Sequence, residues 1–299
     1  MEEKDIGFGQ KSSGKGTRFI REDGSINVIR KGLPFFRPYD SYHALITMNW
    51  GKFLLIIFLG FFALNALFAL LYSLLPGIEI STISTHSWGE LFWENFFFSI
   101  QTFSTVGYGT MSPISFEAKM LSAFESFVGL VGLAIMTGIL YGRFSNPNAK
   151  IKYSKKMLIA PFGNGKALMF KMANQRSSKL IEAEVTMVVN YLENGKRHYQ
   201  NLELQLRQIS FFALTWTVVH PIDEKSFFHQ RSKTEVEASD AEIIILVKAF
   251  DDTFSQTVYS RRSYKPYDLE WNAKFDPSIM EEDGQMMIDL DQLDNYQKL

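Results

Sequence analysis

A chain of 299 residues is long enough for two ordinary domains, and its net charge of −1 at pH 7 gives no indication of a nucleic-acid partner. The absence of cysteine excludes disulfides, thiol nucleophiles and cysteine-ligated metals. The mean hydropathy near zero averages a very apolar half and a polar half. The first fifty residues contain no early apolar core, so we expect no cleavable signal peptide.

Two segments precede the first strongly apolar stretch. Residues 1–33 are predicted to form a cytoplasmic N-terminal arm, because up to about Asn27 they are rich in Gly, Ser, Lys and Glu, a composition typical of a mobile or extended segment. Residues 34–50 mix aromatic and aliphatic side chains with charged ones such as Arg37, which favours an interfacial helix. A soluble surface helix is the alternative, but the apolar stretch that follows favours the membrane interface.

The next two segments differ in length and therefore in what they predict. Residues 53–75 contain no charged side chain, and at about 1.5 Å per residue they cross a hydrocarbon core of roughly 30 Å, which predicts a transmembrane helix. Residues 89–102 are rich in aromatic side chains but too short to span. They suit a re-entrant pore helix covered by protein, whose C-terminal end directs a partial negative charge toward a cation.

A pentapeptide follows this run directly: Thr105, Val106, Gly107, Tyr108 and Gly109. Its sequence is that of the potassium selectivity filter, in which backbone carbonyls replace the hydration shell of the ion. Successive carbonyls point at one axis only if some residues have positive φ, which glycine adopts at no steric cost. We therefore expect the carbonyls of residues 105–108 to bind K⁺ and four chains to complete the ring. An ordinary glycine turn is the alternative.

Residues 120–142 form the second predicted span. The carboxylate of Glu125 is costly in lipid, so we expect this residue to face protein and to form structural hydrogen bonds behind the filter rather than an ion site. Four glycines follow it: Gly129, Gly132, Gly138 and Gly142. Their spacing leaves close helix packing and a gating bend equally open, with Gly129 and Gly138 as the hinge candidates.

Lysine and arginine set the expected orientation. Neither occurs in residues 53–118, whereas both flanks of the predicted pore domain, residues 51–147, are basic. The positive-inside rule then places both termini in the cytoplasm and the filter outside, in a multi-pass protein of the cell (inner) membrane.

Residues 148–299 change to the alternating pattern of β-strands. Such alternation occurs at residues 183–189, 213–219 and 242–247, and the pairs Asn164-Gly165 and Asn194-Gly195 indicate hairpin turns. This favours a cytoplasmic β-sandwich of the immunoglobulin-like kind. The predicted fold class is therefore a membrane α plus all-β protein. This half contains no phosphate loop with Walker spacing and no metal-ligand pattern among its histidines, so we expect neither an enzyme nor an organic cofactor.

In this order the segments resemble the inward-rectifier potassium channels, and most of all their prokaryotic branch. Three stretches support the resemblance besides the filter: residues 39–45 (YDSYHAL), 141–147 (YGRFSNP) and 220–226 (HPIDEKS). The resemblance implies a homotetramer that conducts K⁺ passively and is gated at its inner helices by the cytoplasmic domain and by membrane lipid. Two alternatives remain: a two-span channel gated by a soluble ligand, and a membrane-anchored β-domain that binds a partner protein.

The resemblance also implies roles for single residues. The gate candidates are Leu133, Thr137 and Tyr141, and the lipid-headgroup candidates are Arg37, Arg143, Lys150 and Lys152. Leu133 occupies the position that controls polyamine block, and because it is apolar we expect no strong polyamine-dependent rectification. Animal members often have a Glu/Arg pair around the filter, where this chain has Gln101 and Met111. Filter support is therefore expected from Gln101 and Glu125.

Overall fold

The computed structural model describes residues 18–29, 31–32, 38–81, 83, 87–145, 149–176, 179–282 and 285–299. Within it the chain divides into two compact units. One unit comprises Leu33–Asn146, and the other combines Met1–Gly32 with Pro147–Leu299. Arg37, a predicted headgroup ligand, lies outside the described residues.

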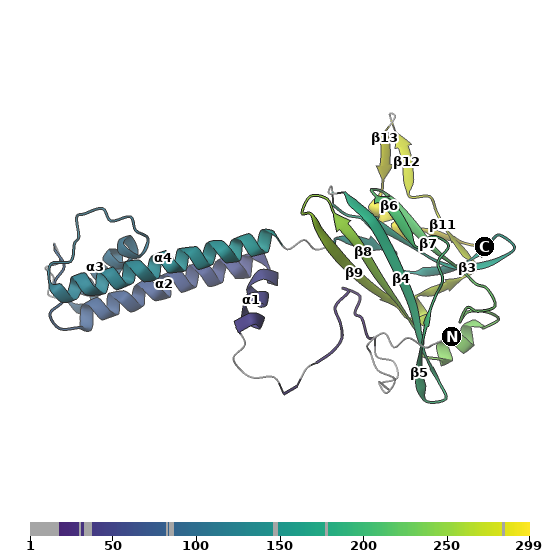
Figure 1. The fold of residues 1–299 in the computed structure, drawn as a ribbon, viewed down its shortest axis with the longest axis horizontal. Helices are drawn as coiled ribbons and strands as arrows, with labels where there is room; N and C mark the ends of the chain where they lie inside the picture. Colours follow the sequence, from purple (N-terminus) through teal and green to yellow (C-terminus); the bar gives the residue numbers. More distant parts are fainter. Residues whose placement is uncertain are drawn as a thin grey trace. The chain divides into compact units, whose positions relative to one another are not determined.

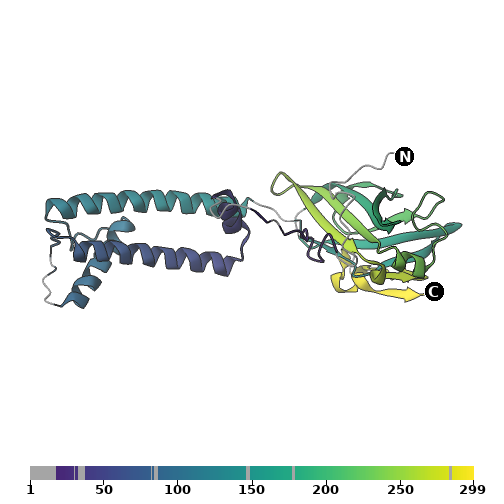
Figure 2. The ribbon, with the colours of Figure 1, turned by 90° about the horizontal axis from the view of Figure 1, so that it is seen from below.

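The first unit is helical and contains α1 (Pro38–Thr47), α2 (Trp50–Leu74), α3 (Trp88–Phe103) and α4 (Phe116–Phe144). By length and composition α2 and α4 are apolar enough to cross a membrane, and they include the spans predicted at residues 53–75 and 120–142 except for Leu75. Within this unit α2 and α4 lie side by side, α3 packs against both near one end, and α1 packs against α4 near the other (Figure 1, Figure 2).

The ends of these helices follow from local sequence. The side chains of Asn49 and Ser115 accept hydrogen bonds from the first turns of α2 and α4, respectively, and so cap their free N–H groups. Pro76, which has no N–H group, follows the last turn of α2, and Gly77 then adopts a φ of +80°. The chain therefore turns back at this point.

The second unit is built from β-strands in two five-stranded sheets (Figure 1). One sheet contains β1 (Ile151–Tyr153), β2 (Met157–Phe162), β3 (Gly165–Asn174), β7 (Thr215–Pro221) and β10 (Leu269–Trp271). The other contains β4 (Leu180–Glu193), β5 (Lys196–Asn201), β6 (Gln208–Phe212), β8 (Glu242–Asp251) and β9 (Gln256–Tyr264). The predicted all-β domain is therefore present.

Side chains from both sheets share one core. Ile159, Leu168 and Phe170 of the first sheet are fully buried together with Ile243 and Ile245 of the second. The sheets thus form a sandwich, as expected. Smaller elements complete the unit: α5 (Lys233–Ala238), β11 (Ala273–Phe275), β12 (Ile279–Glu282), β13 (Gln285–Ile288), β14 (Tyr296–Lys298) and two 3₁₀ turns, η1 (Pro266–Asp268) and η2 (Leu290–Asp294).

Two turns and one crossover show where the sequence pattern was accurate and where it was displaced. Asn194 and Gly195 both have positive φ and join β4 to β5, as the Asn-Gly pair predicts. Between β2 and β3 the residue with positive φ is Gly163, one position before the predicted pair. The strand predicted at residues 213–219 begins at Thr215, because residues 213–214 carry the chain from β6 in one sheet to β7 in the other.

Part of the predicted arm is packed against the β unit. The carboxylate of Glu242, which is fully buried, accepts hydrogen bonds from the backbone N–H groups of Phe19 and Ile20 at 3.0–3.3 Å. Arg18 pairs with Asp268. The described residues 18–29 are therefore held by specific contacts, which composition alone did not indicate.

Candidate ion-conducting site

The backbone of the predicted filter, residues 105–109, alternates between positive and negative φ. Thr105 has a φ of +60°, Gly107 of +51° and Gly109 of +81°, while Val106 and Tyr108 are not among the residues with positive φ. Such alternation turns successive carbonyls toward the same side of the chain, which is the arrangement that replaces the water shell of an ion. The sequence indicated the two glycines, but it gave no signal for positive φ at the β-branched Thr105.

The filter begins where the pore helix α3 ends. The N–H of Thr105 donates to the carbonyl of Thr102, and the N–H of Gly107 donates to that of Gln101, each at 3.1 Å. These bonds fix the N–H side of the filter against the end of α3. The partial negative charge of this helix end thus lies beside the filter.

The C-terminal end of the predicted filter is tied to the segment that precedes α3. The N–H of Ser81 donates to the carbonyl of Ser112 and that of Ile114 to Glu79, both at 2.8 Å, and Ile80 bridges Pro113. This small antiparallel contact anchors the chain just after the filter. No local sequence pattern indicated this pairing, because it joins residues about 30 positions apart.

Gln101 and Met111, at the positions of the animal Glu/Arg pair, are in contact. The amide Nε2 of Gln101 donates to Met111 Sδ at 3.4 Å, a weak hydrogen bond without charge. Gln101 is mostly buried, and its Oε1 has no partner among the described residues. The neutral pair therefore contributes little, so other bonds must support the filter.

Glu125 supplies such bonds between three helices. It is fully buried; its Oε2 accepts a hydrogen bond from Tyr72 Oη of α2 at 2.7 Å, and its Oε1 contacts Ser99 Oγ of α3. Ser99 Oγ also lies 3.0 Å from Asn65 Oδ1 of α2. The expectation that Glu125 faces protein agrees with this geometry. Its partners Tyr72, Ser99 and Asn65 were missed, although Asn65 is a rare polar residue in an apolar span.

The glycines of α4 differ in what surrounds them. A Cβ atom on Gly129 would lie 2.2 Å from the carbonyl oxygen of Phe103, and one on Gly142 would lie 2.8 Å from Tyr42 Oη of α1. Both positions thus allow close approach of another helix. A Cβ on Gly138 would meet no atom within 4 Å, and α4 continues through it as an uninterrupted helix. Packing accounts for Gly129 and Gly142, and Gly138 has no packing role in the single chain.

The three gate candidates line one stripe of α4. Leu133, Thr137 and Tyr141 are spaced by four residues, so their side chains follow one another along the helix. All three are exposed in the single chain, Tyr141 at 74%. The hydroxyl of Thr137 donates to the backbone carbonyl of Leu133 at 2.9 Å, one turn earlier in α4.

Arg143 joins α4 to α1 and to the start of α2. Its guanidinium donates to the backbone carbonyls of Leu45 and Met48, the latter at 2.8 Å. It also stacks over the rings of Trp50 and Phe53, with 4.5 and 4.3 Å to the ring centroids. Arg143 is therefore engaged within the chain.

The other described headgroup candidates belong to the β unit. Lys150 is exposed, and Lys152 Nζ lies 3.2 Å from Asp291 Oδ1. Because Asp291 is itself almost fully exposed, this ion pair is solvated and weak. Both amines are thus available to an anion in the described part of the chain.

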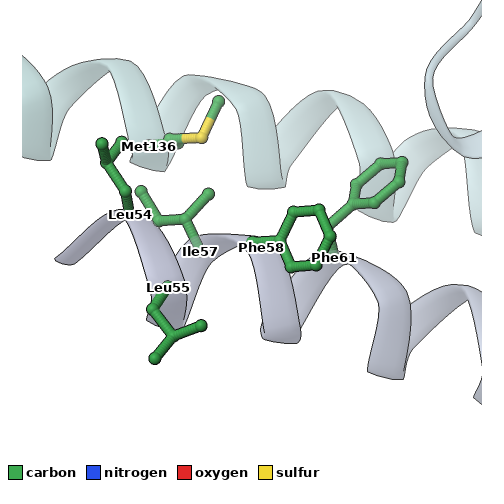
Figure 3. A pocket seen from close by; sticks show the side chains of 6 residues that line it. All are labelled: Leu54, Leu55, Ile57, Phe58, Phe61 and Met136. Carbon is green, nitrogen blue, oxygen red and sulfur yellow. The ribbon is translucent and has the colours of Figure 1, made fainter. Parts of the chain in front are cut away.

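An apolar groove lies between α2 and α4 (Figure 3). It is lined by Leu54, Leu55, Ile57, Phe58, Phe61 and Met136. None of these side chains offers a polar group to an ion or a polar ligand. The groove therefore fits an acyl chain or a neighbouring apolar helix rather than a cofactor.

The described part of the β unit shows no comparable chemical site. His220 is buried between the carbonyl of Glu203, 2.6 Å from Nδ1, and Ser226 Oγ, 2.8 Å from Nε2, and this burial lowers its pKa. It is a structural histidine. Across the described residues, no cluster of three or more histidines and carboxylates is placed to hold a metal ion.

Comparison with known proteins covers both units. Residues 151–299 match the family model "Inward rectifier potassium channel C-terminal domain", and residues 54–145 match the model "Ion channel". The chain is 34% identical to the inward rectifier potassium channel Kirbac3.1 of Paramagnetospirillum magnetotacticum over 94% of its own length and 96% of that protein. It is 24% identical to the G protein-activated inward rectifier potassium channel 2 of Rattus norvegicus and of Homo sapiens, over 91% of its length and 70% of theirs.

Proposed function

Because this chain belongs to the inward-rectifier potassium channel family, we propose that four copies of it form a pore that conducts K⁺ passively across a membrane. The observation that carries the proposal is the alternating backbone of the Thr-Val-Gly-Tyr-Gly segment at the end of α3. One chain supplies only a quarter of a carbonyl ring, so the mechanism requires four. Channels of this family are not enzymes, which confirms that expectation from the sequence.

The conduction mechanism follows from the filter backbone. The carbonyls of residues 105–108 take the place of the water oxygens that K⁺ loses on entry. Thr105 adds a hydroxyl at the inner mouth, and Val106 and Tyr108 point away from the axis to hold the diameter of the ring. No organic cofactor takes part, and K⁺ is the permeant ion.

The topology that accompanies this function has both termini in the cytoplasm of the cell (inner) membrane. It is supported by two apolar helices and by the absence of Lys and Arg from residues 53–118. The filter then faces the outside and the β-sandwich the cytoplasm.

Gating is assigned to the cytoplasmic end of α4, where Tyr141 is the bulkiest residue of the stripe and Gly138 offers a bend one turn before it. Arg143 connects this end to α1, so that movement of the interfacial helix reaches the gate. Anionic lipid headgroups are drawn to Arg37, Arg143, Lys150 and Lys152, each basic residue contributing about 1 kcal/mol near a charged surface. The guanidinium of Arg143 is already hydrogen-bonded to backbone carbonyls. Among the described candidates, Lys150 and Lys152 are therefore more available to bind a headgroup.

The function is tested by reconstituting the purified protein in liposomes and measuring Rb⁺ uptake. We expect uptake that external Ba²⁺ blocks, because both ions enter K⁺ sites, and no matching Na⁺ flux. Empty liposomes serve as the control. Absence of uptake, or an equal Na⁺ flux, would reject a potassium channel and leave the reading of a membrane-anchored β-domain.

A further inference from the structure

The buried contacts of Glu125 contain one more acceptor than the hydroxyl groups can serve. Tyr72 Oη donates to Glu125 Oε2 at 2.7 Å. Ser99 Oγ lies within hydrogen-bond distance of both Glu125 Oε1 and Asn65 Oδ1, the latter at 3.0 Å. A hydroxyl has only one hydrogen, so Ser99 cannot donate to both oxygens at once.

The orientation of the Asn65 side-chain amide is fixed by its hydrogen bond to the backbone of α2. Asn65 Nδ2 donates to the carbonyl of Phe61 at 2.8 Å, one turn earlier in α2, so Oδ1 is the end that faces Ser99. Asn65 is fully buried, and its Oδ1 therefore needs a donor from the protein. Ser99 is the donor that the structure provides.

We propose that Glu125 is a neutral carboxylic acid that donates the missing hydrogen bond from Oε1 to Ser99. Each hydrogen then has one acceptor. Tyr72 donates to Glu125, and Glu125 donates to Ser99. Ser99 donates to Asn65, and the amide of Asn65 donates to the backbone of α2. If Glu125 were ionised instead, Ser99 would have to donate to it, and Asn65 Oδ1 would be left buried without a donor.

The charges around Glu125 agree with the neutral form. No ion pair within the described residues involves this fully buried carboxyl. Tyr72 is the titratable group that α2 places against it, and α3 contributes the uncharged Ser99. Removing an unpaired carboxylate from water is costly, whereas a carboxylic acid with a donor and an acceptor partner is readily buried.

The proton has a positioning role, and this part of the inference rests on the proposed channel function. The proton completes a series of hydrogen bonds that joins α2, α3 and α4 at Ser99. Ser99 lies two residues before Gln101, and the carbonyl of Gln101 accepts a hydrogen bond from the N–H of Gly107. A second contact, from Asn95 of α3 to Ser73 of α2 at 3.0 Å, fixes the same helix one turn earlier. The protonated Glu125 thus positions the pore helix that carries the filter.

Infrared spectroscopy of the reconstituted full chain at neutral pH tests the proton directly. We expect a carboxylic-acid C=O stretching band that is lost in Glu125→Gln and kept in the control Glu117→Gln, an exposed residue on the same helix. Because the amide of glutamine offers the same donor and acceptor, Glu125→Gln should also retain Rb⁺-over-Na⁺ selectivity in flux assays.

The wild-type spectrum alone can overturn the inference: carboxylate bands without an acid band would show that Glu125 is ionised. If Glu125→Gln fails to assemble, Ser99→Ala replaces it, since loss of the acceptor should shift the acid band, and an unshifted band would contradict the assignment. If the protein shows the acid band but conducts no Rb⁺, the channel function is rejected and the inference that Glu125 is protonated stands. If the protein conducts Rb⁺ but shows no acid band, only the inference that Glu125 is protonated is rejected.

Discussion

A methyl group added at Gly107 or Gly109 would meet no atom within 4 Å in the single chain, yet both residues have positive φ. Within one chain, glycine is therefore favoured at the filter by the hand of its backbone rather than by lack of space. A side chain in this conformation costs about 1–2 kcal/mol. The same strain is tolerated at Thr105, where the bonds to the end of α3 hold the chain.

Gly107→Ala is expected to abolish K⁺ selectivity or conduction. Strain of about 1–2 kcal/mol in each of four chains favours rotation of the peptide that follows Val106, which removes a carbonyl from the ring. Flux of Rb⁺ and Na⁺ into liposomes measures the effect. Gly60→Ala is the matched control, because Gly60 lies in α2 with no atom near its added methyl group and no positive φ. Unchanged selectivity in Gly107→Ala would remove the filter role.

The sequence predicted that Glu125 has a structural role but did not predict which residues it contacts. The cost of a carboxylate in an apolar span identified Glu125, because that argument needs only the residue and its segment. Its bonds to Tyr72 and Ser99 join residues 53 and 26 positions away, and they depend on how three helices pack. No local pattern encodes such a distance.

The helix α4 is packed against other helices near Gly129 and Gly142 and has fewer contacts between them. Gly129 brings it against the end of the pore helix, and Gly142 brings it against α1, where Arg143 adds bonds to two backbone carbonyls. Between these contacts, a Cβ atom added at Gly138 would meet no other element of the described chain within 4 Å. The spacing of the glycines left packing and bending open, since only the neighbours of each glycine separate the two.

Tyr141→Ala is expected to raise the open probability of the channel. If the exposed ring closes the cytoplasmic end of the pore, loss of roughly 1 kcal/mol of ring contacts in the closed state raises the open-to-closed ratio about fivefold. Single-channel recording in bilayers of defined lipid composition measures it. Tyr141→Phe keeps the ring and should behave like the wild type. Equal gating in all three proteins would exclude Tyr141 as the gate.

For the molecule as a whole, the length of the apolar runs predicted two spans and a short pore helix, and hydrophobic alternation predicted a β-sandwich, because each depends on the pattern within one segment. The order of strands within the two sheets and the crossover at residues 213–214 did not follow from that pattern. The docking of Phe19 and Ile20 on Glu242 was also unpredicted, since it joins segments more than 220 residues apart.

The central claim is that four filters form a K⁺-selective pore. The most direct test is the reversal potential of the purified protein in a planar bilayer with K⁺ on one side and Na⁺ on the other. We predict a potential displaced far toward the value for a membrane permeable to K⁺ alone, with current that Ba²⁺ blocks. A reversal potential close to zero, or no current at any lipid composition, would contradict the account.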